Sequence, residues 1–271
     1  MGTTSIHIPF IAIDPSPPAS HTHTVVFLHG RGDNARKFAA SLAYSRDSQG
    51  RTPADAFPSF RWVFPQAPTH QCASLPETWP QWFDVWNVAD FAENEDLQAV
   101  GLREVVPALR GILADEARLL GGRFDRVVLA GISMGAATGA HVLFNLDVPP
   151  AVGGRLAAFM GFSCRCPFVG RDLAGMRRVL GLEGTPDHGD VIRNTPVLLE
   201  HCVDDPLVLV QSGYGMRDTL RGFGAQVEWK EYPEGGHWFH SPDGMDDAVD
   251  FLNRHVLGKN GSVGASAMDL S

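Results

Sequence analysis

The sequence has 271 residues, of which 44% are hydrophobic and 20% charged, as in a soluble globular protein with a substantial core. Its 22 basic and 31 acidic residues give a net charge of −9, and no cluster of Lys and Arg stands out. This balance argues against binding to nucleic acid or to anionic lipid, because both need a cationic surface. We expect a small-molecule or acyl-chain substrate instead.

No apolar run is long enough to span a membrane, and the N-terminal segment lacks the basic and apolar regions of a signal peptide. The four cysteines do not have the spacing of a zinc site, since Cys164 and Cys166 are separated by a single residue. The histidines are scattered and form no His-Glu-x-x-His motif, so we expect no metal. The expectation is a cytoplasmic protein with free thiols and no integral membrane association.

Short apolar runs alternate with helical patterns along the chain, which is typical of a mostly parallel sheet covered by helices. Strands are predicted at 22–30, 60–68, 124–131, 155–163, 195–202 and 225–233. Helices are predicted at 94–120, from about 134, at 206–221 and at 243–257. In the first helix, Leu97 and Val100 belong to the predicted apolar stripe, and Pro107 should kink or restart the helix.

The chain shows no internal repeat and no linker, so one domain is expected over residues 1–258, with its core at 24–257. The polar stretch 259–271 is expected to be a disordered tail. Residues 168–194 are interpreted as a long loop. We consider this loop and the segment 45–59 as candidate lids over a site.

The stretch "GISMG" places Ser133 between two glycines, directly after a predicted strand and before a helix rich in small residues. This spacing and context are typical of a nucleophile elbow, in which glycines allow strained dihedral angles and a close approach of helix and sheet. A glycine-rich turn without catalytic function is the alternative. The context favours Ser133 as a nucleophile.

A serine nucleophile also needs backbone donors for the oxyanion that forms during acyl transfer. The N–H of Met134, at the start of the predicted helix, is the first expected donor. The second is the N–H of Arg31 in the loop "HGRG", which follows the first predicted strand.

The remaining requirements are a base and an acid that orients it, in the order Ser, Asp or Glu, His. His237 lies in a glycine-flanked loop between the last predicted strand and helix, and we expect it to be the base, with His240 as its competitor. Asp204 and Asp205 follow the strand 195–202, and either position reaches the carboxyl edge of the sheet. His201, at the end of that strand, is interpreted as structural.

Taken in order, these motifs resemble those of the acyl-protein thioesterase/carboxylesterase family of α/β hydrolases. The resemblance runs from about residue 24 to 256 and rests on "HGRGD" (29–33), "PQAP" (65–68), "WFDVW" (82–86), "GISMG" (131–135), "DDPLV" (204–208) and "EGGHWF" (234–239).

The resemblance implies a single-domain α/β-hydrolase fold that cleaves esters or thioesters through an acyl-enzyme, with no metal or organic cofactor. It implies Ser133 as nucleophile, His237 as base and Asp205, rather than Asp204, as the acid. The chain departs from the family at Met134, where Gln is usual, and this change concerns the substrate more than the reaction.

Four aromatic residues cluster before the long helix, at Trp79, Trp82, Phe83 and Trp86. They are candidates for lining a substrate channel, and the alternative is that they fill the core beneath a loop. The resemblance places Trp82 and Phe83 close to the cleft.

The substrate is expected to be an S-acylated protein or a small molecule with an apolar acyl group. The alternatives are a small-molecule carboxylesterase of specialised metabolism and an inactive hydrolase-fold ligand receptor.

Overall fold

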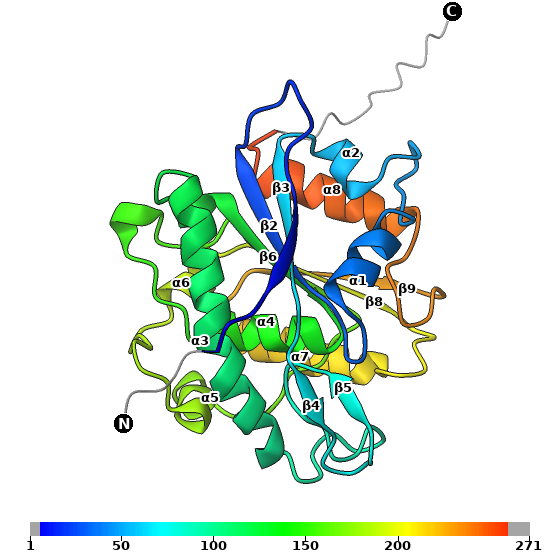
Figure 1. The fold of residues 1–271 in the computed structure, drawn as a ribbon, viewed down its shortest axis with the longest axis vertical. Coiled ribbons are helices and arrows are strands. Elements are labelled where there is room, and N and C mark those ends of the chain that lie inside the picture. Colours follow the sequence, from blue (N-terminus) through cyan, green and yellow to red (C-terminus); the bar gives the residue numbers. More distant parts are fainter. Residues whose placement is uncertain (1–5, 260–271) are drawn as a thin grey trace, which may run out of the picture.

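A seven-stranded sheet organises the computed structural model, which describes residues 6–259 (Figure 1). The strand order is β1-β3-β2-β6-β7-β8-β9, with β1 antiparallel to β3 and the other pairs parallel. The strands are β1 Phe10–Ile13, β2 His23–Leu28, β3 Phe60–Pro65, β6 Val127–Ile132, β7 Ala158–Phe162, β8 Val197–Cys202 and β9 Val227–Tyr232. The expected mostly parallel α/β architecture is confirmed.

Helices cover both faces of this sheet (Figure 1). Their bounds are α1 Ala35–Leu42, α2 Pro53–Ala56, α3 Asp96–Leu119, α4 Met134–Phe144, α5 Leu173–Leu180, α6 Asp190–Asn194, α7 Val210–Gly222 and α8 Asp243–His255, with short turns η1 Phe124–Arg126 and η2 Pro150–Val152. Helices α3 to α7 share one hydrophobic cluster, whereas α1 and α8 belong to the other. Among residues 6–259, no helix combines the length and apolarity needed to cross a bilayer.

The central strands are apolar throughout because both of their faces are covered. Every residue of β6, β7 and β8 is buried. Along β6, Leu129 packs in the cluster with α3 and α4, whereas Val128 and Ala130 pack in the cluster with α1 and α8. A parallel sheet buried on both faces accounts for the continuous apolar runs from which these strands were predicted.

Two details of the predicted long helix are corrected by the structure. Helix α3 continues through Pro107 as one element, so of the two expected effects of the proline, a kink or a restart, the restart does not occur. Leu102, Val105 and Val106 around the proline are fully buried, and this packing against the sheet outweighs the lost backbone hydrogen bond. Val100, predicted on the apolar stripe, is exposed.

The helix predicted at 206–221 begins later, since α7 starts at Val210.

The interpretation of residues 168–194 as a long loop is wrong, because this stretch contains α5 and α6. Asp172 caps α5 by accepting a hydrogen bond from the N–H of Gly175. Met176, Leu180 and Ile192 are buried in the cluster shared with α3 and α4. A capping Asp followed by apolar residues at helical spacing was the signal in the sequence. Packed into the core in this way, α5 and α6 do not form a lid.

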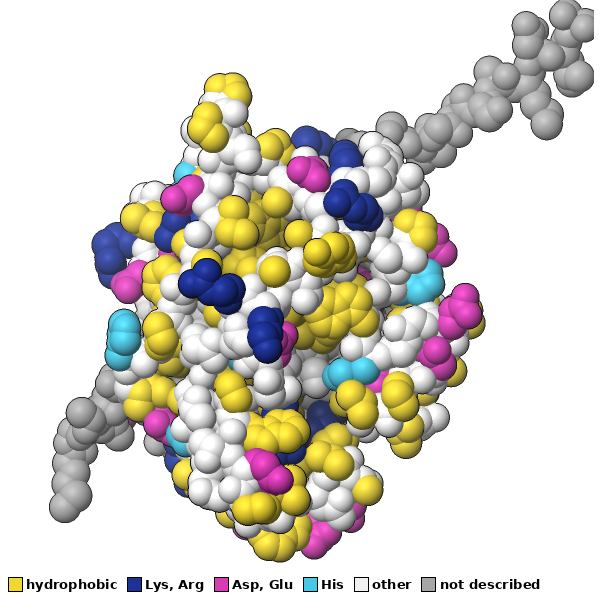
Figure 2. Space-filling view, turned by 45° about the vertical axis from the view of Figure 1, so that its right-hand side comes forward, with side chains coloured by type: hydrophobic (Ala, Val, Ile, Leu, Met, Phe, Trp, Pro, Cys, Tyr) yellow, Lys and Arg dark blue, Asp and Glu magenta, His cyan; other side chains and the backbone are white. Residues whose placement is uncertain are grey.

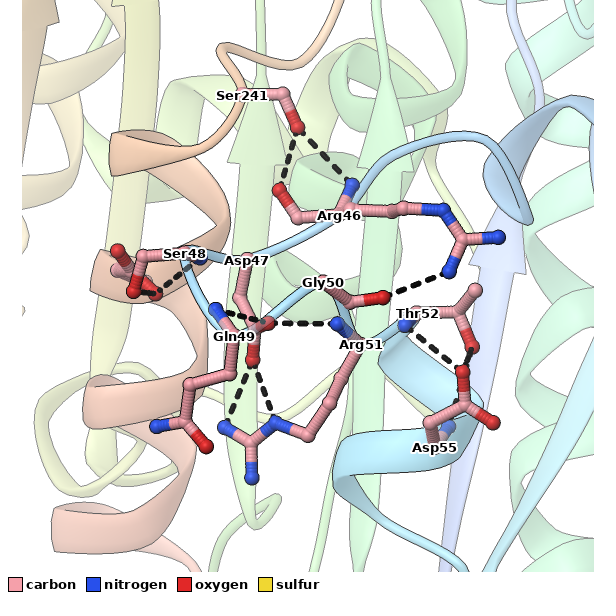
Figure 3. A network of polar contacts seen from close by, with 10 residues as sticks. Arg46, Asp47, Ser48, Gln49, Gly50, Arg51, Thr52, Asp55 and Ser241 are labelled. Atoms are coloured by element: carbon pink, nitrogen blue, oxygen red, sulfur yellow. Dashed lines mark hydrogen bonds and ion pairs between the residues drawn. The ribbon is translucent and has the colours of Figure 1, made fainter.

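The segment 45–59 is held by a polar network rather than left free (Figure 3). The Asp47 carboxylate accepts hydrogen bonds from the backbone and side chain of Arg51. The backbone N–H of Arg46 donates to Ser241 Oγ, just before α8, and that hydroxyl donates back to the Arg46 carbonyl. These contacts hold the segment on the α8 side of the sheet. A segment fixed in this way is not expected to act as a lid.

Several elements had no counterpart in the prediction: β1, α1, α2 and a small hairpin of β4 Thr69–Gln71 and β5 Thr78–Pro80. All of them are short, and the strands β1, β4 and β5 have no buried residue. Apart from Lys259, the predicted tail at 259–271 lies outside the described residues.

Candidate active site

Ser133 sits at the sharp turn between β6 and α4. Its backbone has φ 55° and ψ −124°, a conformation that non-glycine residues adopt rarely. The strain is held by hydrogen bonds on both sides of the peptide: Ser133 N–H donates to the Phe162 carbonyl of β7, and its own carbonyl accepts from Ala137 N–H in α4. The turn therefore presents a half-buried serine at the carboxyl edge of the sheet.

Gly135 explains why this turn can be so tight. A Cβ atom at this position would lie 2.3 Å from the Leu28 carbonyl oxygen and 2.6 Å from that of His29. The first turn of α4 thus packs directly on the end of β2, and any side chain would force the two apart. This contact brings the loop after β2 next to Ser133.

The loops that follow β8 and β9 bring an acid and a histidine together. His237 Nδ1 donates a hydrogen bond of 2.7 Å to Asp205 Oδ2. Asp205 is buried, whereas the His237 side chain stays 19% exposed. Because Nδ1–H donates to the carboxylate, the tautomer that this hydrogen bond favours leaves Nε2 to act as a base.

Asp205 is stabilised in its charged form. Burial by itself would raise its pKa, but hydrogen bonds from His201 and His237 and from the backbone N–H groups of Val208 and Leu207 outweigh burial and hold the pKa well below its ordinary value. A carboxylate with this many donors stays ionised and keeps the imidazole oriented.

The neighbouring Asp204 has a different set of contacts. Its two carboxylate oxygens accept hydrogen bonds from the backbone N–H groups of Gly235 and Gly236, at 3.3 and 2.8 Å. Asp204 therefore holds the loop that carries His237 without contacting the imidazole, while Asp205 contacts it directly.

His201 is a neighbour of Asp205 whose contact with the acid was not predicted. Its Nε2 donates to the Val208 carbonyl at 2.7 Å and lies 3.5 Å from Asp205 Oδ2. The His201 side chain is fully buried, so it contacts Asp205 from the interior of the protein and not from the cleft. Its position four residues before Asp205, at the end of a strand, was the available signal. The His240 ring, the predicted competitor of His237, stacks on Tyr232 at 4.4 Å.

The loop after β2 lies against Ser133, as the sequence led us to expect for a source of oxyanion donors. A Cβ atom at Gly30 would lie 3.5 Å from the Ser133 Cβ. Arg31 follows directly, and Met134 is the first residue of α4, where backbone N–H groups have no partner within the helix. Both residues line the same cleft as Ser133.

The region of the β4–β5 hairpin braces this loop. Trp82 is fully buried, and its Nε1 donates to the His29 carbonyl at 2.8 Å. The Arg31 guanidinium donates to Gln81 Oε1 at 2.8 Å and lies 5.1 Å from the Trp79 ring centroid. These contacts hold the Arg31 guanidinium and the backbone carbonyl of His29, two residues before it.

A cleft of about 700 Å³ joins these residues. Its lining comes from the loop after β2, the 75–91 region, the elbow, the loop after β7 and the two loops of the acid and the histidine: Gly30, Arg31, Asp33, Leu75, Trp79, Phe83, Val85, Val88, Ala89, Phe91, Ile132, Ser133, Met134, Arg165, Pro206, Leu207, Val208, His237 and Trp238. Hydrophobic side chains gather in several groups on the face shown in Figure 2, with charged side chains scattered among them.

Two of the four predicted aromatic residues lie at this cleft. Trp79 and Phe83 line it. Trp82 does not, because it is buried under the loop after β2, as the core-filling alternative supposed. Trp86 does not line it either: it is 38% exposed, and its Nε1 donates to Glu93.

Comparison with known proteins gives a consistent family relationship. A family model described as phospholipase/carboxylesterase matches residues 12–256. Acyl-protein thioesterase 1 of Gibberella zeae is 28% identical over 250 residues, which cover 90% of this chain and 95% of that protein. A probable inactive carboxylesterase of Oryza sativa is 29% identical over 227 residues, or 81% of this chain and 79% of that relative.

The fold has solved counterparts. The crystal structure of Zea mays acyl-protein thioesterase 2 superposes with a TM-score of 0.67 at 24% identity, covering 92% of this chain and 99% of that one. The Arabidopsis thaliana protein SOBER1 superposes with a TM-score of 0.65 at 21% identity over 86% of this chain. At these identities the likeness establishes the α/β-hydrolase fold.

Proposed function

This chain belongs to the phospholipase/carboxylesterase family and is a serine hydrolase of the α/β-hydrolase fold, and from that premise we propose that Ser133, His237 and Asp205 are its catalytic triad. The observation that carries the assignment is the 2.7 Å hydrogen bond between His237 and Asp205, at the cleft that Ser133 also lines. The strained backbone of Ser133 supports its role as nucleophile, because strain of this kind is retained at functional sites.

The triad acts by acyl transfer. Ser133 Oγ attacks the carbonyl carbon of the substrate while His237 Nε2 accepts the hydroxyl proton, and the carbonyl oxygen becomes an oxyanion. The N–H groups of Arg31 and Met134 donate to that oxyanion. Collapse of the intermediate expels the alcohol or thiol, which takes the proton from His237, and a water molecule then hydrolyses the acyl-enzyme by the same steps.

We propose esters or thioesters with an apolar acyl group as substrates, because apolar side chains such as Phe83 and Val88 line the cleft. Relatives named acyl-protein thioesterases favour S-acylated proteins as the substrate class. Cytoplasmic residence, where thiols stay reduced, agrees with four buried and unpaired cysteines.

A small-molecule carboxylesterase is the second candidate, and Met134 at the cleft wall favours it, because the family resemblance leads one to expect Gln there. Hydrolysis of short aryl esters compared with that of an S-palmitoyl peptide separates the two. Fast cleavage of the ester without cleavage of the peptide would exclude the thioesterase assignment.

An inactive receptor is the alternative from another class, and one relative carries the name of a probable inactive carboxylesterase. We expect a fluorophosphonate probe to form an adduct on Ser133, and Ser133→Ala to abolish labelling and to lower ester turnover by about 10⁴-fold or more. Labelling read by intact-protein mass spectrometry decides the matter. Absence of an adduct on the folded wild-type protein would favour the receptor.

A further inference from the structure

The loop after β7 places a buried cation in the cleft. Arg165 is only 7% exposed, yet it lines the cleft together with Ser133 and His237. Its guanidinium lies 4.1 Å from the Phe91 ring centroid and 5.6 Å from that of Phe83. Stacking on two rings restricts the rotamers of the side chain, so the charge is held in one place.

No carboxylate within residues 6–259 lies close enough to Arg165 to form an ion pair with it. Among residues 6–259 the guanidinium forms no ion pair, and its one hydrogen bond runs from Nη2 to Gln98 Oε1 at 2.7 Å. Burial lowers the pKa of Arg165 to about 10, which leaves the group cationic at neutral pH. The nearby Glu95 carboxylate opposes the effect of burial by raising this pKa, but it accepts its hydrogen bond from the N–H of Phe168 and not from the guanidinium.

Arg31, the other arginine of the cleft, shows the contrast. Its guanidinium donates to Gln81 and lies 3.8 Å from an oxygen of Asp84, so its charge is partnered. Among the described residues that line the cleft, Asp33 is the one with a carboxylate side chain. Arg165 is therefore the arginine of the cleft whose guanidinium keeps N–H groups without a protein acceptor.

Those donors are accessible. A guanidinium has five N–H groups, and the protein uses one of them in Arg165. No nitrogen of Arg165 is among the fully buried polar atoms that lack a partner in the described chain, and the side chain lines the cleft. A buried cation without an anion costs free energy that a bound anion would recover.

We propose that Arg165 is a specificity residue that binds a carboxylate of the substrate, so that the enzyme prefers esters or thioesters bearing an anionic group. A planar carboxylate matches the paired donors of a guanidinium and gains a charge-assisted interaction in a partly dry site. This assignment rests on the proposed function, because the ester bond must reach Ser133 in the same cleft.

The test uses two pairs of matched esters that differ in charge. On the acyl side, 4-nitrophenyl hydrogen adipate is compared with 4-nitrophenyl hexanoate. On the alcohol side, 4-(carboxymethyl)phenyl acetate is compared with 4-ethylphenyl acetate. We expect kcat/KM of the wild-type protein to be about tenfold or more higher for the anionic member of one pair, and the pair concerned tells which part of the substrate carries the carboxylate.

Arg165→Met should abolish this preference while hydrolysis of the neutral esters persists, and Arg165→Lys should retain part of it. Arg171→Met removes the same charge from an exposed position on the same loop and should leave the preference intact. Equal or lower kcat/KM for both anionic esters in the wild type, or an unchanged preference in Arg165→Met, would overturn the proposal.

A measurement of adipate binding tests the role of Arg165 independently of the proposed hydrolytic function. Adipate should raise the Tm of the wild-type protein and of Arg165→Lys more than that of Arg165→Met, whether or not turnover occurs. Failure to hydrolyse any of the four esters would count against the proposed function, whereas an equal Tm shift in wild type and Arg165→Met would count against Arg165. Melting curves without adipate establish that each variant is folded.

Discussion

At the scale of single residues, the adjacent side chains of Asp204 and Asp205 differ in the groups that donate hydrogen bonds to them. Asp204 accepts from the backbone of the 235–236 loop, while Asp205 accepts from the imidazole of His237. In the sequence the two are neighbours with the same chemistry, and reasoning from residues left both open. Their roles differ because the chain turns between them and sends the two side chains to different targets.

Replacing Asp205 by Asn should therefore be far more damaging than replacing Asp204. We expect Asp205→Asn to lower kcat by about 10³- to 10⁴-fold, because an amide no longer holds the productive tautomer of His237. Asp204→Asn keeps one oxygen that can accept from the Gly235 and Gly236 N–H groups. We therefore expect this substitution to lower kcat by about tenfold or less.

Steady-state kinetics with a short aryl ester measures both variants, which are matched in size and charge change. A severe loss in Asp204→Asn with a mild one in Asp205→Asn would show that the acid has been assigned to the wrong residue.

At the scale of elements, the elbow depends on how closely α4 approaches β2. The contact between Gly135 and the carbonyl groups of Leu28 and His29 places the loop after β2 beside Ser133. The same glycine spacing that predicted the motif thus positions the expected oxyanion donors. Gly111 in α3 carries no such requirement, because a Cβ atom there would meet nothing within 4 Å.

Gly135→Ala should destabilise the protein by about 1–3 kcal/mol or more, because the added Cβ overlaps backbone atoms that cannot move aside. It should also lower kcat, since the strand and the helix must separate at the elbow. Gly111→Ala, in α3, meets nothing within 4 Å and should stabilise the protein by about 0.5–1 kcal/mol.

Urea unfolding and ester kinetics on the two variants provide the comparison. A Gly135→Ala protein as stable and as active as wild type would mean that the elbow tolerates a wider separation than the structure describes.

At the scale of the whole molecule, the stability of the fold depends on a carboxyl group far from solvent. Glu200, on β8, is 3% exposed, and neither of its carboxylate oxygens has a hydrogen-bond partner among residues 6–259. Burial raises its pKa well above the ordinary value of 4.5, and the Asp247 carboxylate raises it further against the opposing effect of Lys230. The folded protein thus keeps a proton that the unfolded chain releases.

The sign of the pH dependence follows. Above pH 4.5, Glu200 binds fewer protons in the unfolded state than in the folded state, so the contribution of this group to the free energy of unfolding falls as pH rises. The loss is about 1.4 kcal/mol for each pH unit over which Glu200 is protonated only in the folded state. Glu200→Gln removes this term, and we expect its stability to decrease less than that of wild type between pH 5 and pH 8.

Urea unfolding at the two pH values measures the difference. Glu183→Gln, at an exposed position, is the control and should behave like the wild type. If Glu200→Gln lost as much stability as wild type over the same interval, Glu200 would be excluded as the source.

Most of the architecture was predictable from the sequence because a strand buried on both faces of a sheet is a continuous apolar run. The strands β2, β6 and β8 appeared as continuous apolar runs, and α3, α4 and α8 as patterned segments. The misses were the short helices α1, α2, α5 and α6, whose apolar residues lie among small, polar and charged ones, and the strands β1, β4 and β5, which bury little. Local patterns are weakest in short elements, because few apolar positions are available to show a period.

The sequence by itself determined the fold class, the family resemblance and the order of Ser133, Asp205 and His237, since these depend on spacing along the chain. Only the tertiary structure decided that Asp205 contacts His237, that Trp82 is buried while Trp79 lines the cleft, and that Arg165 shares this cleft. The physical reason is that β7, β8 and β9 end at one edge of a parallel sheet, where loops distant in sequence converge. Which side chains meet there is set by packing.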